Sequence, residues 1–310
     1  MKYYLYSAGL ILIAIILAIT TPFLVDFADG VLVSAQIPSN NAQVAGIQQY
    51  NIPPSNQGFP VPGVSARAVL IKDLSTGTVL YQKDSNIPYP IASTTKIMTA
   101  LVASEYFKPE AVLTVGDSAN IPGSRVGLTY GENLTFQSLL YGMLLNSGND
   151  AAYAIAENFP GRIFGFVSAM NKKALQLNLR NTSFDNPAGF DSINQYSSAE
   201  DLAKITEEAL KNSQLAIIFA TEKTNIVSLN KKYTHQLVNL NKLLSSVSGV
   251  LGIKTGTTEG AKENLVTLVD RNKHRVLLVV LGSNDRFTET TSLIDWTYYN
   301  FIWSDSGIVR

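Results

Sequence analysis

Six consecutive apolar residues near the end of the chain, Val276 to Leu281, constrain the fold more than any other feature. A strand of this kind offers no polar side to water, so both faces of its sheet must be covered. A second strand-like run, Asn264 to Asp270, precedes it across a short polar turn. Two further runs, Ala66 to Lys72 and Thr78 to Lys83, flank a turn that contains glycine, as in a hairpin. The sequence therefore predicts strand pairs at both ends of one domain.

The residues between these strand pairs have helical spacing. Thr135 can cap a helix over Gln137 to Leu145. Further helices are predicted over residues 151–157, 162–177, 198–211 and 289–302. We expect an α+β fold, in which one antiparallel sheet built from both chain ends is flanked by helices and the helical middle forms a lobe. A cleft between the lobe and the sheet is the expected place for a functional site.

The N-terminal part of the chain has a different character. Residues Tyr6 to Val25 are almost wholly apolar, and about 20 such residues can span the hydrocarbon layer of a membrane. Lys2 precedes this run and Asp26 follows it, so the body of the protein should lie outside the cytoplasm. Small residues at Val33-Ser34-Ala35 leave a cleaved signal peptide as the alternative. The length of the run favours a retained membrane anchor.

These patterns divide the chain into four parts. Residues 1–30 form the anchor or signal segment, and residues 31–62 are predicted to be a flexible linker. The linker is rich in Gln, Asn, Pro, Ser and Gly, so it cannot bury enough apolar surface to fold by itself. Residues 63–304 form the domain that carries any chemistry, and residues 305–310 are a short tail.

Composition excludes several classes of function. The formal net charge is zero and no long basic run is present, which argues against nucleic acid as a partner. Cysteine is absent, so there is no thiol nucleophile and no thiolate metal site. His235 and His274 are far apart and show no zinc-binding spacing. We therefore predict no metal and no cofactor. A Ser-His-Asp triad would need one of these two histidines, and no Gly-x-Ser-x-Gly elbow is present.

Ser93-Thr94-Thr95-Lys96 opens an apolar, helix-like run. If a helix begins here, Ser93 and Lys96 lie one turn apart on the same face. A serine hydroxyl needs a neighbouring base, and a lysine can act as one only if burial or a nearby cation lowers its pKa. The motif by itself is weak, because roughly one Ser-x-x-Lys is expected by chance in a chain of ordinary composition. Ser228-Leu229-Asn230-Lys231 also matches, in a stretch predicted to be strand or loop.

Two other short motifs offer polar groups that could complete a site. Ser147-Gly148-Asn149 follows the helix capped by Thr135, although Ser-x-Asn is common and often marks a turn or a helix cap. Lys254-Thr255-Gly256 occurs once. On a strand facing a cleft, it would provide a cation and a hydroxyl for a carboxylate, with glycine permitting close approach. Its other interpretation is a glycine turn between strands.

Ser-x-x-Lys, Ser-x-Asn and Lys-Thr-Gly occur in this order on a predicted helix, loop and strand. The chain thereby resembles penicillin-binding proteins and class A β-lactamases. It is most similar to the low-molecular-mass penicillin-binding proteins of the D-alanyl-D-alanine carboxypeptidase family (serine peptidase family S11). The resemblance runs from about Ala66 to Ile302 and is supported by matching segments within residues 127–152, 184–191 and 260–265.

This resemblance implies a role for each motif residue, and the local chemistry agrees with it. Ser93 would be the nucleophile, Lys96 its general base, and Ser147 a relay of the proton to the leaving amine. Asn149 would hold the substrate backbone. The terminal carboxylate would be bound by Lys254 and Thr255, next to Gly256, and the oxyanion by the backbone N–H groups of Ser93 and Thr257.

The resemblance also implies a substrate. The expected activity is removal of the terminal D-Ala from peptidoglycan stem pentapeptides, outside the cytoplasm in the periplasm or at the outer face of the cell membrane. Class A β-lactamases deacylate with a glutamate, whereas Asp185 to Gly189, the corresponding stretch, has none. β-Lactams should therefore be covalent inhibitors. A D,D-endopeptidase that cuts cross-links and a non-enzymatic penicillin-binding sensor remain alternatives.

Three departures from the family pattern are visible. Gln195 stands where relatives often have His, and Tyr130 where they often have Pro; we expect both to tune activity. The sequence given ends shortly after its last predicted helix. We therefore expect no counterpart of the C-terminal β-domain and amphipathic anchor of many relatives, and we expect the N-terminal apolar run to replace that anchor.

Overall fold

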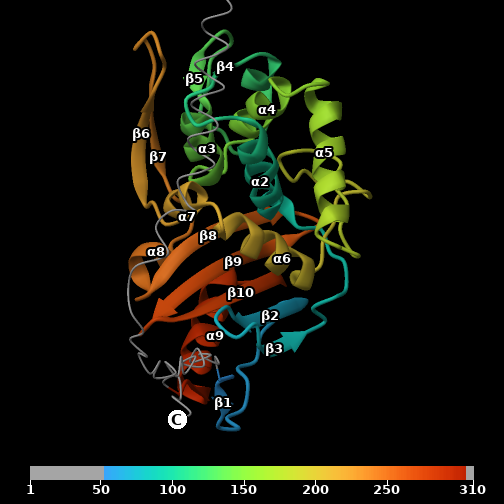
Figure 1. Ribbon diagram of the computed structural model, residues 1–310, viewed down its shortest axis with the longest axis vertical. Helices are drawn as coiled ribbons and strands as arrows, with labels where there is room; N and C mark the ends of the chain where they lie inside the picture. Colours follow the sequence, from blue (N-terminus) through green and yellow to red (C-terminus); the bar gives the residue numbers. More distant parts are fainter. Residues whose placement is uncertain (1–51, 305–310) are drawn as a thin grey trace, which may run out of the picture. The chain divides into compact units, whose positions relative to one another are not determined.

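The computed structural model describes residues 52–304. Its centre is a five-stranded antiparallel sheet with the order β3-β2-β10-β9-β8 (Figure 1). The strands are β2 (Ala68–Asp73), β3 (Val79–Lys83), β8 (Val250–Thr258), β9 (Lys262–Arg271) and β10 (His274–Ser283). Because β10 pairs with β2, the two chain ends meet in one sheet. The predicted α+β fold is confirmed.

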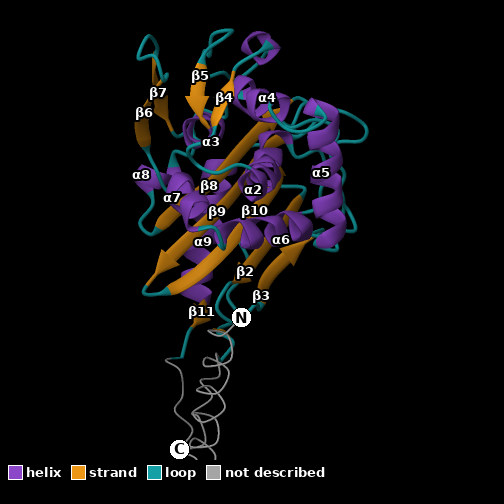
Figure 2. Ribbon diagram, turned by 45° about the horizontal axis from the view of Figure 1, so that its top comes forward, coloured by secondary structure: helices purple, strands orange, loops and turns teal. Residues whose placement is uncertain are grey.

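The central strand β10 is covered on both faces, as its continuous apolar run predicts. Leu277, Val279 and Leu281 face one hydrophobic core, and the residues between them face another. The first core lies under α6 (Ala199–Leu210) and α2 (Lys96–Tyr106), and the second under α9 (Arg286–Asn300). Figure 2 shows α6 and α9 on opposite faces of the sheet.

The helical middle of the chain forms the predicted lobe, above the sheet in Figure 1. It contains α3 (Phe136–Leu144), α4 (Asn149–Glu157) and α5 (Arg162–Gln176) beside α2. Thr135 caps α3, because its Oγ1 accepts from the N–H of Ser138 at 3.1 Å. The short strands β4 (Val112–Thr114) and β5 (Asn133–Thr135), and the 3₁₀ turn η3 (Asp117–Asn120), complete this lobe.

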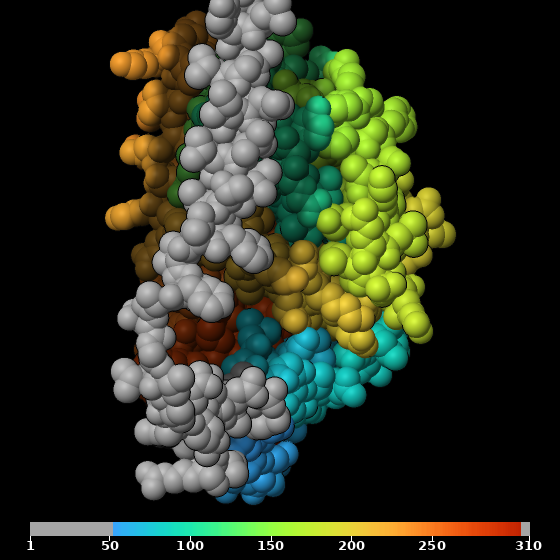
Figure 3. All heavy atoms as spheres, viewed as in Figure 1, coloured from blue at the N-terminus to red at the C-terminus, as the bar shows by residue number. Residues whose placement is uncertain are grey.

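Three elements between the lobe and β8 were not predicted. They are α7 (Ser213–Phe219), α8 (Leu243–Ser246) and a hairpin of β6 (Lys223–Val227) and β7 (Thr234–Val238). Only one or two side chains of each hairpin strand are buried, so the apolar alternation is too short to be recognised. In the space-filling view the hairpin forms one edge of the domain, in orange (Figure 3).

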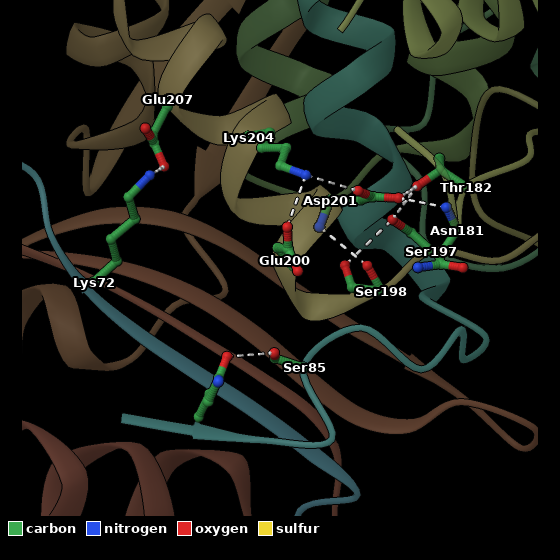
Figure 4. A network of polar contacts seen from close by, with 11 residues as sticks. Lys72, Ser85, Asn181, Thr182, Ser197, Ser198, Glu200, Asp201, Lys204 and Glu207 are labelled. Atoms are coloured by element: carbon green, nitrogen blue, oxygen red, sulfur yellow. Dashed lines mark hydrogen bonds and ion pairs between the residues drawn. The ribbon is translucent and has the colours of Figure 1, made fainter. Parts of the chain in front are cut away.

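Helix α6 begins in a buried polar network (Figure 4). Ser198 Oγ accepts from the N–H of Asp201 at 3.1 Å and caps the helix. The buried carboxylate of Asp201 accepts from Asn181 N at 2.8 Å and from Thr182 Oγ1 at 2.9 Å. At the other end of the helix, Glu207 pairs with Lys72 of β2 at 2.7 Å. These contacts hold the helix between the sheet and the loop that precedes it.

Residues 52–62 differ from the expected flexible linker. Ser55–Asn56 form strand β1, which pairs with β11 (Phe301–Ile302) just after α9. Phe59 packs on Tyr299 with ring centroids 4.6 Å apart, and its carbonyl accepts from Trp296 Nε1 at 3.1 Å. The composition of this segment predicts no regular structure, but its aromatic contacts and strand pairing hold it in place.

The apolar run Tyr6 to Val25 and the tail 305–310 lie outside the described residues. Within residues 52–304, no helix is long and apolar enough to cross a membrane.

We predict that Trp296→Ala lowers the free energy of unfolding by about 3–5 kcal/mol, because it removes a buried aromatic side chain. Trp296 is 9% exposed, and its ring packs against Tyr81 and Phe301. Urea unfolding followed by circular dichroism measures the change. Ser292→Ala is the matched control on the same helix. Ser292 is exposed, so its loss should cost less than about 1 kcal/mol. Equal effects of the two variants would contradict the prediction.

Candidate active site

Ser93 lies in a 3₁₀ turn, η2 (Ala92–Thr95), that leads directly into α2. Ala92 starts the turn with a left-handed φ of 47°. In 3₁₀ geometry the side chains at positions i and i+3 eclipse each other. This brings Ser93 Oγ to 2.9 Å from Lys96 Nζ. The Ser-x-x-Lys spacing predicts that the two side chains share one face of a helix. A 3₁₀ turn aligns positions i and i+3 more closely than an α-helix does.

Lys96 is fully buried and has three oxygen neighbours. Its Nζ lies 2.8 Å from Asn149 Oδ1, 2.6 Å from the carbonyl oxygen of Ala188 and 2.9 Å from Ser93 Oγ. The two carbonyl oxygens can only accept hydrogen bonds, whereas the serine hydroxyl can also donate one. A neutral amine has two N–H groups and one lone pair. When both N–H groups point to the carbonyls, the lone pair faces the Ser93 hydroxyl.

The surroundings of Lys96 favour this neutral form. Burial and the positive charge of Lys254 hold the pKa of Lys96 well below its usual value, against an opposing contribution from Asp150. The Asp150 carboxylate is itself buried and accepts the backbone N–H groups of residues 126–128 at 2.9–3.1 Å. These hydrogen bonds tie residues 126–128 to the first turn of α4.

Asn149 stands at the start of α4, and its amide is held in one orientation. Its Nδ2 donates to the carbonyl of Pro122 at 2.8 Å, so its Oδ1 faces Lys96. The family resemblance implies that Asn149 holds the substrate backbone. The structure shows in addition that Asn149 Oδ1 accepts a hydrogen bond from Lys96, a contact that the sequence did not predict. One N–H of the Asn149 amide bonds Pro122, and the other could bind the substrate backbone.

Ser147 is 3% exposed and takes a left-handed φ of 57° in the residue pair before α4. Within residues 52–304 it is not among the hydrogen-bond partners of Lys96. Ser93, Lys96 and Asn149 are therefore in direct contact, whereas Ser147 is connected to this group only as the residue two positions before Asn149. If Ser147 relays a proton from Lys96 to the leaving amine, substrate binding would have to bring the two side chains into contact.

Lys254-Thr255-Gly256 lies on β8, the edge strand of the sheet. A Cβ atom at Gly256 would lie 3.1 Å from Ser93 N and 3.0 Å from the carbonyl oxygen of Ile91. Glycine thus lets the strand pack against the turn that carries Ser93. The alternative interpretation, a glycine turn between strands, is wrong. Lys254 is 2% exposed, and its Nζ donates to the carbonyl of Thr255 at 3.0 Å.

Arg286, the first residue of α9, was missed by sequence reasoning. Its Nη1 donates to the carbonyl of Gly256 at 2.9 Å and contacts Thr257 Oγ1. Burial and the charge of Arg286 lower the pKa of Lys254 to about 7. Arg286 lies far along the chain from the three motifs, and no local spacing marks it. The positive charge of Arg286 therefore acts on Lys254, and that of Lys254 acts on Lys96.

The residues set aside in the sequence analysis lie elsewhere. Ser228 Oγ donates to Asn230 Oδ1 at 2.8 Å, so the second Ser-x-x-Lys match does not pair its serine with its lysine. His235 pairs with Glu132 at 2.8 Å, and His274 stacks on the ring of Trp303. In the described part of the chain, neither histidine is a partner of Ser93.

Comparison with known proteins agrees with this geometry. The family model described as D-alanyl-D-alanine carboxypeptidase matches residues 56–285. The carboxypeptidase DacF of Bacillus subtilis is 36% identical over 246 residues, which cover 76% of this chain and 63% of DacF. The chain thus spans less than two thirds of that relative.

Other relatives are covered more completely. A D-alanyl-D-alanine endopeptidase of Pseudomonas aeruginosa is 31% identical, with 79% of this chain and 81% of that protein covered. The crystal structure of the Streptomyces K15 DD-transpeptidase superposes with a TM-score of 0.72 at 32% identity, covering 78% of this chain and all of that one. The chain belongs to the D-alanyl-D-alanine carboxypeptidase family of penicillin-binding serine peptidases (family S11).

Proposed function

We propose that this protein is a serine-type D-alanyl-D-alanine carboxypeptidase that removes the terminal D-Ala from peptidoglycan stem pentapeptides. The observation that carries the proposal is the position of Lys96 Nζ, which lies 2.9 Å from Ser93 Oγ and within hydrogen-bond distance of two carbonyl oxygens. In the neutral amine these two acceptors take both N–H groups, so the lone pair faces Ser93. Family membership supports the substrate class. The proposed location is outside the cytoplasm, at the membrane surface, and rests on this substrate and on the apolar run Tyr6 to Val25.

The proposed reaction begins with proton transfer from Ser93 Oγ to Lys96 Nζ as Oγ attacks the carbonyl carbon of the penultimate D-Ala. The backbone N–H groups of Ser93 and Thr257 would stabilise the oxyanion. The C–N bond then breaks, and the leaving amine of D-Ala takes a proton that Ser147 passes on from Lys96. The remaining ester on Ser93 is hydrolysed by water, which regenerates the hydroxyl.

Recognition of the substrate carboxylate is assigned to the edge strand. Lys254 and Thr255 provide a cation and a hydroxyl beside Ser93, and Arg286 adds a second cation through Gly256 and Thr257. β-Lactams carry a carboxylate next to their reactive carbonyl, so we expect them to acylate Ser93 and remain bound. One relative is a D-alanyl-D-alanine endopeptidase, and cleavage of cross-linked peptides by the same site is therefore the second candidate.

The activity is tested by incubating the purified protein with a pentapeptide ending in D-Ala-D-Ala and, separately, with cross-linked muropeptide dimers. We expect mass spectrometry to show loss of one alanine from the pentapeptide, with the dimers intact. Conversion of dimers to monomers would replace the carboxypeptidase assignment with the endopeptidase one. If penicillin labels the protein but neither product forms, the protein would instead be a non-enzymatic penicillin-binding sensor.

Ser93→Ala should abolish covalent labelling by penicillin, because it removes the hydroxyl that lies 2.9 Å from Lys96 Nζ. Intact-mass spectrometry detects the acyl adduct directly. Ser228→Ala is the matched control, since it removes the serine of the other Ser-x-x-Lys match; its labelling should equal that of the unaltered protein. Labelling of the Ser93→Ala variant would overturn the assignment of the nucleophile.

The pH dependence follows from the two lysines. Lys254 must be charged to bind a carboxylate, and its pKa is about 7. Since kcat/KM reports groups of the free enzyme, kcat/KM for the pentapeptide should fall as pH rises through about 7. Removing the positive charge in Arg286→Gln should raise the pKa of Lys254, so the alkaline limb should move to higher pH while KM increases.

A matched control for this measurement is Arg271→Gln, which removes a surface arginine paired with Asp295 at 3.2 Å. Its pH profile should coincide with that of the unaltered protein. An alkaline limb that stays in place in Arg286→Gln would show that Lys254 does not set it.

A further inference from the structure

The carbonyl of Ala188 reaches Lys96 from a loop, residues 184–195, that we term the Ala188 loop. The side chain of Asn186 folds it, because Asn186 Oδ1 accepts the backbone N–H groups of residues 188, 189 and 190 at 2.7–3.2 Å. Gly189 has a φ of +92°, and a Cβ atom there would lie 1.9 Å from the carbonyl oxygen of Ala92. The loop therefore packs against the turn of Ser93 without space for a side chain at position 189.

Gln195 joins this loop to the residue before Lys96. Its side chain is buried, with 2% of the residue exposed. Its Oε1 accepts from Asp185 N at 2.6 Å and from Asn186 N at 3.1 Å, and its Nε2 donates to Thr95 Oγ1 at 2.8 Å. One amide thus holds both the base of the Ala188 loop and the turn that leads into Lys96. No charged group takes part in this link.

Further contacts support the loop at other points. Thr99 Oγ1 donates to the carbonyl of Pro187 at 2.7 Å, one turn further along α2. Asp191 accepts from Thr258 Oγ1 at 2.7 Å and from Gly260 N at 3.1 Å, at the end of β8. The Thr99 contact holds the peptide next to Ala188 from one turn further along α2, whereas Gln195 ties the start of the loop to Thr95, the residue that precedes the base.

We propose that Gln195 is a positioning residue for the acylation reaction: it holds the Ala188 carbonyl against Lys96 so that the lone pair of the neutral amine faces Ser93. This inference rests on the proposed function. When the carbonyl shifts, one N–H of Lys96 loses its acceptor and the amine rotates away from the hydroxyl. Small displacements of reacting groups cost large factors in rate.

The inference predicts a signature that a merely structural role would not give. Besides orienting the amine, the Ala188 carbonyl stabilises the protonated form of Lys96 by its dipole. Gln195→Leu should therefore lower the plateau rate of penicillin acylation by about 10-fold or more and move the acid limb of its pH profile to lower pH. The charged groups that face Lys96, Lys254 and Asp150, are unchanged in this variant, so they cannot cause the shift.

The matched control is Asn171→Leu. Asn171 also bonds a loop backbone, since its Oδ1 accepts from Phe184 N at 2.9 Å and its Nδ2 donates to Phe184 O at 2.7 Å, but it does not contact Thr95. It should lower the melting temperature and leave the acid limb in place. Gln195→His should restore most of the rate, because imidazole offers one acceptor and one donor nitrogen. Thr95→Val, which removes a single acceptor, serves if Gln195→Leu does not fold.

The acylation rate is measured by stopped-flow with a chromogenic β-lactam between pH 5 and 10, and each variant is checked by circular dichroism. A folded Gln195→Leu or Thr95→Val variant whose rate falls by the same factor at every pH would overturn the inference. So would a profile identical to that of Asn171→Leu. If the unaltered protein is not acylated at Ser93, the proposed function itself fails, and this result is distinct from either outcome.

Discussion

The burial of one amine, Lys96, governs the rest of the site. A charge at this depth is costly, and the adjacent Lys254 increases the cost, so the neutral form is favoured. A neutral amine is useful as a base only when its lone pair points at the nucleophile. The two carbonyls that orient it come from residues 53 and 92 positions away, on α4 and on the Ala188 loop. Its reactivity therefore depends on the whole lobe having folded.

Backbone packing around Ser93 places the remaining groups. Gly189 and Gly256 bring the Ala188 loop and the edge strand against the turn of Ser93; a Cβ atom would clash at position 189 and would be tightly packed at position 256. Asn264 reinforces the arrangement, since its Nδ2 donates to the carbonyl of Pro90 at 3.2 Å and its Oδ1 accepts from Gly282 N at 2.7 Å. The turn that carries Ser93 is thus held by close backbone contacts with the Ala188 loop and β8. The Asn264 side chain links Pro90, which precedes the turn, to β10 through Gly282.

Features encoded locally could be predicted from the sequence. The apolar run Val276 to Leu281 indicates a strand covered on both faces, and Thr135 and Ser198 lie where helices begin. The order of three short motifs, read with a family resemblance, indicated which residues would lie together. The Ala188 carbonyl has no such signature, because any residue provides one. Arg286 was missed because its relation to Lys254 exists only after α9 packs on the sheet. Residues 52–62 resemble a linker in composition, and their order comes from distant aromatic partners.

The pairing of β1 with β11 has a mechanical consequence. The described chain enters the domain at Ser55–Asn56 and leaves it at Phe301–Ile302, along the same two strands. The amide of Asn300 is bonded to Phe59 N at 2.8 Å and to Asn56 Oδ1 at 3.0 Å. Tension applied through the residues before Ser55 would act first on the β1–β11 pair and on the end of α9. The turn of Ser93 packs against β8 and the Ala188 loop instead. We therefore expect it to keep its geometry until β1 and β11 separate.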